Sequence, residues 1–173
     1  MPDLAFRLAR DADAAAVVPL VNGAYRGDST GGTGWTHEKD LVAGARIDEA
    51  GFRAYLSAPD SVVLLAERRA RVVGCVHLVR QEEECFLGML SVHVAEQASG
   101  VGRALLAEAE RYARDGLGAR VMAMRVVTVR AELLAWYERR GYRRTGRVEA
   151  FAPRADAVSL RGPLDFERLE KPL

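Results

Sequence analysis

The feature that most constrains the fold is a pair of glycines, Gly100 and Gly102, at the point where a strand pattern changes into a helical pattern. The preceding segment, CFLGMLSVHV, reads as a buried strand, and VGRALLAEAE repeats apolar residues at helical spacing. A structural turn needs one glycine. The second glycine predicts that a ligand approaches the start of the helix, because a Cβ there would keep the ligand away from the backbone. The plainer alternative is a turn that binds nothing.

Three phosphate-binding arrangements use glycine between a strand and a helix. A Walker loop requires Gly-Lys-Ser/Thr, which is missing here, and a Rossmann fingerprint requires a third glycine where this chain has Leu105. The third arrangement uses the helix start itself, whose free backbone N–H groups and positive dipole end bind a phosphate. Arg103 would add a charge-assisted contact. The sequence therefore favours a phosphate bound at Gly100 and Gly102.

The N-terminal part of the chain reads as one strand followed by helices. Residues 4–9 alternate apolar and polar side chains, as a half-buried strand does. Residues 14–25 form an amphipathic pattern in which Pro19 predicts a kink or a break. Residues 37–47 and 49–58 read as further helical turns.

The rest of the chain alternates strand and helix patterns in an order that defines the fold class. The predicted helices span residues 99–115 and 131–142, and the predicted strands span residues 61–68, 71–80, 82–94, 120–129, 142–150 and 164–173. We expect an α/β fold with a mixed, mostly antiparallel sheet of about seven strands and helices on both faces.

Composition limits the classes of partner and the compartment. The chain has 25 basic and 24 acidic residues, so its charge does not favour nucleic acid, and the arginines of 139–147 read as a solvated face because no aromatic residues alternate with them. No segment resembles a signal peptide or a membrane span. Cys75 and Cys85 lie in apolar runs and read as buried, reduced thiols. We expect a cytoplasmic protein in which residues 1–173 form one domain.

The segment QASGVG, from Gln97 to Gly102, resembles the Gln/Arg-x-x-Gly-x-Gly/Ala signature of the GNAT superfamily of N-acetyltransferases. LSVHV, AWYERRGY and LDFERLEKPL stand around it in the order that the family has. The resemblance is specific over residues 60–173. In the residues before them, only the order of strand and helices is similar. The resemblance implies acetyl-coenzyme A as co-substrate, direct transfer without a metal, a primary amine as acceptor and, as in many members, a homodimer. It also implies that the strand at 82–94 bulges and splays apart from the strand at 120–129.

The resemblance implies a set of residues around the coenzyme. Leu90 would supply an oxyanion-binding backbone N–H, Val92 and Val94 would meet the pantetheine amides, and Tyr137 would act as general acid toward the thiolate. The full set that it assigns to the coenzyme is Leu90, Ser91, Val92, Val94, Gln97, Ala98, Ser99, Gly100, Val101, Gly102, Arg103, Arg130 and Tyr137.

Two positions depart from the family pattern. Arg130 stands where the family often has Asn, and it could reach a coenzyme phosphate or lie in solvent. Phe86 stands where some members have a Glu that acts as base, and Glu84, on the same strand face, is the best substitute. As candidates for the general base, His77 and His93 rank below Glu84. A base that works through water, with no single residue to name, stays open.

The acceptor is expected on the side opposite the coenzyme. Its predicted lining consists of Tyr25, Arg26, Asp28, Trp35 and Thr36. Of these, Asp28 suits an ammonium and Arg26 a carboxylate. A surface loop without this role is the alternative. The sequence favours a small amine or amino acid as acceptor. A protein N-terminus or lysine is the second candidate, and an acyl-coenzyme A sensor without turnover is a third.

Overall fold

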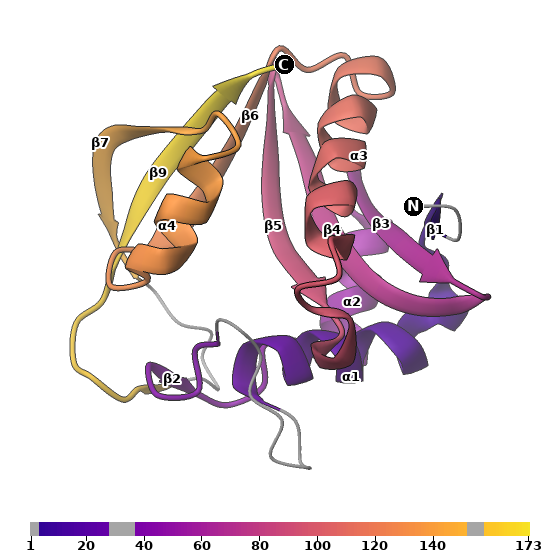
Figure 1. Ribbon diagram of the computed structural model, residues 1–173, viewed down its shortest axis with the longest axis horizontal. Helices are drawn as coiled ribbons and strands as arrows, with labels where there is room; N and C mark the ends of the chain where they lie inside the picture. The colour runs from indigo at the N-terminus through magenta and orange to yellow at the C-terminus, as the bar shows by residue number, and fades with distance from the viewer. Residues whose placement is uncertain (1–3, 28–36, 152–157) are drawn as a thin grey trace.

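The computed structural model describes residues 4–27, 37–151 and 158–173 (Figure 1). The strands are β1 (Leu4–Leu8), β2 (Val42–Ala43), β3 (Ser61–Arg68), β4 (Arg71–Gln81), β5 (Glu84–Val92), β6 (Val121–Val127), β7 (Arg143–Ala150), β8 (Val158–Ser159) and β9 (Asp165–Pro172). The helices are α1 (Ala14–Arg26), α2 (Glu49–Ser57), α3 (Val101–Asp115) and α4 (Ala131–Glu138), with short 3-10 turns at Asp11–Asp13 and Val94–Glu96. None of the helices in this part of the chain has the length and apolar character needed to cross a membrane.

The main sheet has seven strands in the order β1-β3-β4-β5-β6-β9-β7, which confirms the predicted mixed α/β class. Among its strands, only β5 and β6 run parallel. Their register extends from Glu84 opposite Val121 to Leu87 opposite Met124 and then stops. Figure 1 shows the two strands diverging from the end nearest the C-terminus. The predicted splay is therefore confirmed, and it begins just after Leu87.

A β-bulge in β5 lies at the point where the strands part. Cys75 of β4 pairs with Ser91 and His77 pairs with Gly88, so β5 has one more residue than β4 between these pairs. Met89 takes a φ of +55°, in the left-handed region. The bulge changes which face the following side chains occupy. Leu87 packs in the cluster under α3, whereas Met89 packs in the cluster under α1.

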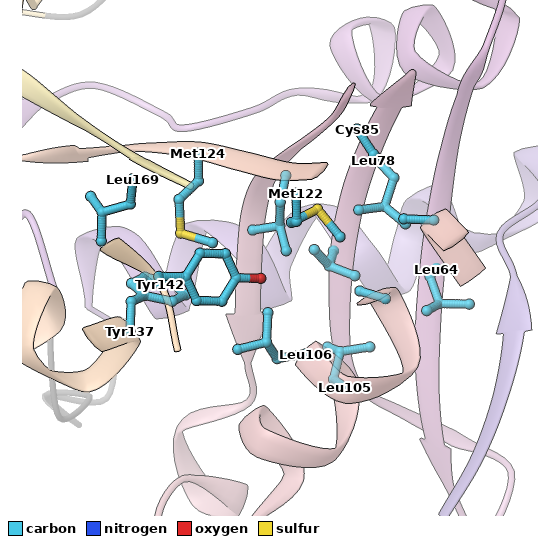
Figure 2. Close-up of a cluster of buried hydrophobic side chains, with 14 of the residues drawn as sticks. Leu64, Leu78, Cys85, Leu105, Leu106, Met122, Met124, Tyr137, Tyr142 and Leu169 are labelled. Carbon is cyan, nitrogen blue, oxygen red and sulfur yellow. The ribbon is translucent and has the colours of Figure 1, made fainter. Parts of the chain in front are cut away.

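Helices cover both faces of the sheet because each face has its own apolar cluster. The α3 and α4 cluster includes Leu105, Tyr137 and Tyr142, which Figure 2 shows, and also Leu134. The α1 and α2 cluster includes Phe52. The buried side chains of α3 recur every four residues or so, as in an amphipathic helix. Complete burial of a leucine such as Leu105 stabilises the fold by about 2 kcal/mol.

The structure differs from two predictions for the N-terminal part, since it has no break at Pro19 and no helix over residues 37–47. Helix α1 runs unbroken from Ala14 to Arg26 through Pro19, because Pro19 and Ala15 are on the exposed side, where water can bond the carbonyl that proline leaves unpaired. Residues 37–47 do not form a helix. Instead β2 pairs with β8, and Val42 packs in a cluster with Val127 and Leu164, so tertiary packing overrides the local helical preference.

Candidate active site

A groove of about 590 Å³ lies where β5 and β6 part, between β5, the start of α3 and α4. Its lining contains eleven of the thirteen residues predicted for the coenzyme: Leu90, Ser91, Val92, Gln97, Ala98, Ser99, Gly100, Gly102, Arg103, Arg130 and Tyr137. The other two lie elsewhere. Val101 is fully buried in the core, and Val94 has left the strand for a 3-10 turn that lines a different groove. The structure therefore does not bring Val94 to the groove that the other predicted coenzyme residues line.

Gly100 and Gly102 are glycines for different physical reasons. Gly100 is the N-cap of α3 with a φ of +88°, a conformation that favours glycine. Gly102 is inside the helix, where an added Cβ would lie 3.5 Å from Val92 Cγ2 and 3.9 Å from Trp136 Cζ2, which is ordinary contact. Neither backbone conformation nor packing explains a glycine at position 102. Open space beside free helix N–H groups fits a phosphate group of the coenzyme.

Arg140 adds a third cation to this groove, beside Arg103 and Arg130, and sequence reasoning missed it by treating it as part of a solvated face. Its guanidinium carbon lies 3.5 Å from the centroid of the Trp136 ring, and Nη1 donates a 2.6 Å hydrogen bond to the Trp136 carbonyl oxygen. Burial, followed by the charges of Arg139 and Arg103, lowers the pKa of Arg140. Among the described residues, Nε of Arg140 is buried without a hydrogen-bond partner. The spacing of Arg140 three residues after Tyr137 was the available signal, since it puts both on one side of the helix end.

We expect Arg140→Gln to raise the dissociation constant for acetyl-coenzyme A about tenfold, because a charge-assisted hydrogen bond to phosphate contributes about 1.5–3 kcal/mol. The free energy of unfolding should change by less than about 1 kcal/mol, since the cation–π contact that is lost is offset by relief of repulsion from Arg103. Calorimetric titration at two salt concentrations measures both affinity and its salt dependence. Arg139→Gln, at the exposed neighbouring position, is the matched control. Equal losses in both variants would contradict a specific role for Arg140.

The bulge and the splay come together at Leu90, which lines the groove. Leu90 and Met89 have no register partner in β4, and the pairing of β5 with β6 ends at Leu87. The Leu90 side chain packs against the α3 cluster, which fixes the strand. A backbone N–H at the edge of such an opening is the kind of donor that stabilises a developing oxyanion. The geometry therefore fits the role predicted for Leu90.

Tyr137 projects from α4 into the same region. Its ring packs edge-on against Trp136, at a centroid distance of 4.9 Å, and against Tyr142, at 5.6 Å. Figure 2 shows Tyr137 beside Tyr142. Burial raises the pKa of Tyr137 above that of a free phenol; nearby Tyr25 adds to the shift, whereas the charges of Arg130 and Arg140 oppose it. The hydroxyl is therefore a neutral hydrogen-bond donor, and a weaker acid than the ordinary phenol that the sequence suggested.

A second cavity, of about 300 Å³, meets the groove from the other side of the splayed strands. Five residues line both spaces: Tyr25, Leu90, Arg130, Leu133 and Tyr137. The cavity also contains Arg26, so two of the predicted acceptor residues are in place. Asp28 and Trp35, with Thr36, lie outside the described residues. The predicted oxyanion donor and the predicted acid thus stand where the two spaces join.

Glu38 is a buried carboxylate that sequence reasoning missed. It is 6% exposed and lines the second cavity, which we call the acceptor cavity because the predicted acceptor residues Tyr25 and Arg26 line it. Its Oε2 accepts from Arg26 Nη1 at 3.0 Å and its Oε1 accepts from Arg130 Nη1 at 2.8 Å. The second contact joins segments 92 residues apart, so no local pattern could have predicted it. The side chain of Arg130 is 12% exposed, which rules out the solvated position that the sequence left open.

The residues considered as bases are not brought to the junction. Glu84 lies at the start of β5 and forms a 2.7 Å ion pair with Arg168, outside both spaces. His77 is bonded to Ser61 at 2.8 Å, and burial, then the Arg46 charge, lowers the pKa of His77 to about 4. His93 caps the 3-10 turn and lines the same groove as Val94. In the described residues, no group of three His, Cys, Asp or Glu side chains could hold a metal ion.

A mixed sheet that opens at its one parallel pair, with a glycine-started helix at the opening, defines the N-acetyltransferase class of α/β proteins. The model of the acetyltransferase (GNAT) domain matches residues 59–144. The chain belongs to the GNAT family of acetyltransferases, whose general co-substrate is acetyl-coenzyme A. No curated protein sequence matches the chain significantly.

Solved structures with the same fold belong to N-acetyltransferases that are named for different acceptors. A ribosomal-protein-alanine N-acetyltransferase from Brucella melitensis has a TM-score of 0.71 at 22% identity, covering 98% of this chain and 99% of that one. A putative phosphinothricin N-acetyltransferase has a TM-score of 0.70 at 18% identity, covering 98% of both chains. Mutant forms of the spermidine/spermine N-acetyltransferase SpeG from Vibrio cholerae have a TM-score of 0.70 at 14% identity, covering 99% of this chain and 95% of that one. At these identities the similarity establishes the fold and leaves the acceptor open.

Proposed function

We propose that this chain is an N-acetyltransferase that transfers the acetyl group of acetyl-coenzyme A directly to a primary amine of a small molecule. The observation that carries the proposal is the meeting of two spaces at Leu90 and Tyr137. One space has the features of a phosphate and pantetheine site, and the other has the volume of a small-molecule pocket. We further propose that residues 1–173 act as one domain, as a cytoplasmic homodimer.

The chemistry of the transfer is simple, so the protein contributes mainly position and electrostatics. Acetyl-coenzyme A, when bound, supplies a thioester whose acetyl carbon bonds to the amine nitrogen while its carbon–sulfur bond breaks. The helix start at Gly100 and Gly102, with Arg103 and Arg140, would hold the coenzyme phosphates. The Leu90 N–H donates to the carbonyl oxygen as negative charge develops on it. The Tyr137 hydroxyl donates to the leaving sulfur.

The amine must lose its proton before it attacks. Glu38 is the one carboxylate lining the acceptor cavity among the described residues, but both of its oxygens already accept hydrogen bonds from arginines, so we do not assign it as the base. We propose that the proton leaves through water, and that Glu38 is a positioning residue that holds Arg130 beside Tyr137. Glu84 is no longer favoured, because its ion pair with Arg168 lies outside both spaces.

The test is calorimetric titration of the purified protein with acetyl-coenzyme A, followed by thiol release with a panel of amines, amino acids and peptides. Micromolar binding and turnover on free amines are expected. Turnover only on peptide N-termini or lysines would mean that the acceptor is a protein rather than a small molecule. Binding without turnover on any amine would favour a sensor. A lack of binding at millimolar coenzyme would overturn the proposal.

A further inference from the structure

The acceptor cavity is unusually rich in guanidinium groups, and most of them are already paired. Arg26 and Arg130 share Glu38, and Arg125 donates to Glu149 Oε2 at 3.0 Å. Arg46 lines the same cavity. In the part of the chain that the structure describes, it is the one cavity arginine that forms no ion pair with a carboxylate.

The backbone at Arg46 is held firmly in place. Asn22 of α1 accepts with Oδ1 from the backbone N–H of Arg46 at 2.7 Å and of Ile47 at 3.2 Å. Its Nδ2 donates to the carbonyl oxygen of Ile47 at 2.8 Å. The Ile47 side chain is buried against α1 and α2. These contacts fix the point from which the guanidinium extends, as a preorganised binding group requires.

The described surroundings of the Arg46 guanidinium supply aromatic groups and no directly bonded carboxylate. Its carbon lies 5.2 Å from the centroid of the Tyr25 ring, and burial raises the pKa of Tyr25, so this phenol is neutral at physiological pH. Tyr55 also interacts with the guanidinium, and His77, which stacks on the Tyr55 ring, is neutral at that pH because burial lowers its pKa to about 4. Glu38 attracts Arg46 only at longer range, because its two oxygens bond other arginines. A half-buried cation in this setting has given up hydration that an anionic ligand would compensate.

We propose that Arg46 binds the carboxylate of the acceptor, and that the acceptor is an amino acid with an apolar side chain rather than a polyamine or a neutral amine. The remaining walls of the cavity are apolar and include Phe86, Met89, Phe151 and Phe166. The described lining carries four arginines against one glutamate, a balance that repels a polycation. This inference rests on the proposed function, because it assigns the substrate class of the same site.

The test compares amino acids with analogues in which only the carboxylate is changed. L-phenylalanine, L-methionine and L-leucine are paired with their amides, and spermidine is included. The wild-type protein should show a kcat/KM about 30-fold higher for the amino acids, as expected for one charge-assisted contact. Arg46→Gln should remove that preference through KM, leave turnover of the amides within about threefold and leave acetyl-coenzyme A affinity unchanged. Arg46→Lys should restore part of the preference. Arg120→Gln, at a 79% exposed side chain, is the matched control.

A second readout separates this inference from the proposed function. Calorimetry measures binding of the three amino acids and their amides in the presence of coenzyme A, with no turnover needed. Amino acids that bind the wild type and not Arg46→Gln support the anchor, even if no acetylation is observed. Equal use of amides, a preference for spermidine, or binding that Arg46→Gln does not weaken would overturn it while the acetyltransferase proposal stands. Failure of all three amino acids both to bind and to react would also overturn it.

Discussion

The Gly102→Glu variant should lose at least 100-fold in affinity for acetyl-coenzyme A while becoming slightly more stable. A Cβ fits at this position, 3.5 Å from its nearest neighbour, and position 102 lines the open groove, so we expect the substitution to leave the fold intact. Replacing a helical glycine gains up to about 1 kcal/mol, and a carboxylate in the first turn of α3 interacts favourably with the helix dipole. The same carboxylate repels a phosphate at the same N–H groups. Calorimetric titration and thermal unfolding of the free protein measure the two effects.

Three further variants separate charge, space and backbone at this position. Ala107→Glu adds the same charge to an exposed position of α3, away from the groove, and should leave affinity within about threefold. Gly102→Ala adds only a methyl group and should weaken binding about tenfold while raising stability. Gly100→Ala should instead lower stability by about 1–2 kcal/mol, because Gly100 has a φ of +88°. A Gly102→Glu protein that binds the coenzyme normally would mean that the phosphate does not lie at this helix start.

The sequence could predict those parts of the site that are contiguous in the chain. Strand and helix patterns place the glycines at the start of α3, and Tyr137 near the end of α4, by local periodicity alone. The contact between Glu38 and Arg130, and the Asn22 bonds that hold Arg46, join segments distant in sequence. Such contacts follow from the topology of the sheet and leave no periodic trace in the sequence.

The bulge in β5 shows why even a local feature of the chain can be impossible to predict from the sequence. Buried and partly exposed residues alternate without interruption from Glu84 to Val92. The alternation continues although Leu87 and Met89 face opposite layers, because helices cover both faces of the sheet at this strand. A change of face is visible in a sequence only where one face is solvated. The bulge was therefore implied by the family resemblance and not by the burial pattern.

Tyr137→Phe should lower kcat about 100-fold and leave acetyl-coenzyme A affinity within about threefold, because the hydroxyl acts on charge that develops only in the transition state. Stopped-flow or thiol-release kinetics under saturating substrates measure kcat, and calorimetry measures affinity. Tyr142→Phe is the matched control. The Tyr142 hydroxyl donates to Glu110 at 3.0 Å and lines neither space, so its loss should cost stability and leave kcat unchanged. Equal losses of kcat in the two variants would mean that Tyr137 only packs.

The pH dependence of the same reaction tests the ionisation state of Tyr137. A free phenol has a pKa of about 10, and burial raises the pKa of Tyr137 above that value, so the folded protein keeps its hydroxyl proton to higher pH. The wild-type kcat should therefore show no fall from phenol ionisation up to about pH 10. A fall between about pH 8 and pH 10 that disappears in Tyr137→Phe would show that the pKa is depressed, and Arg130 and Arg140 would then outweigh burial. With a raised pKa, the hydroxyl helps the thiolate leave mainly by donating a strong hydrogen bond, since complete proton transfer from so weak an acid costs more than the sequence alone suggested.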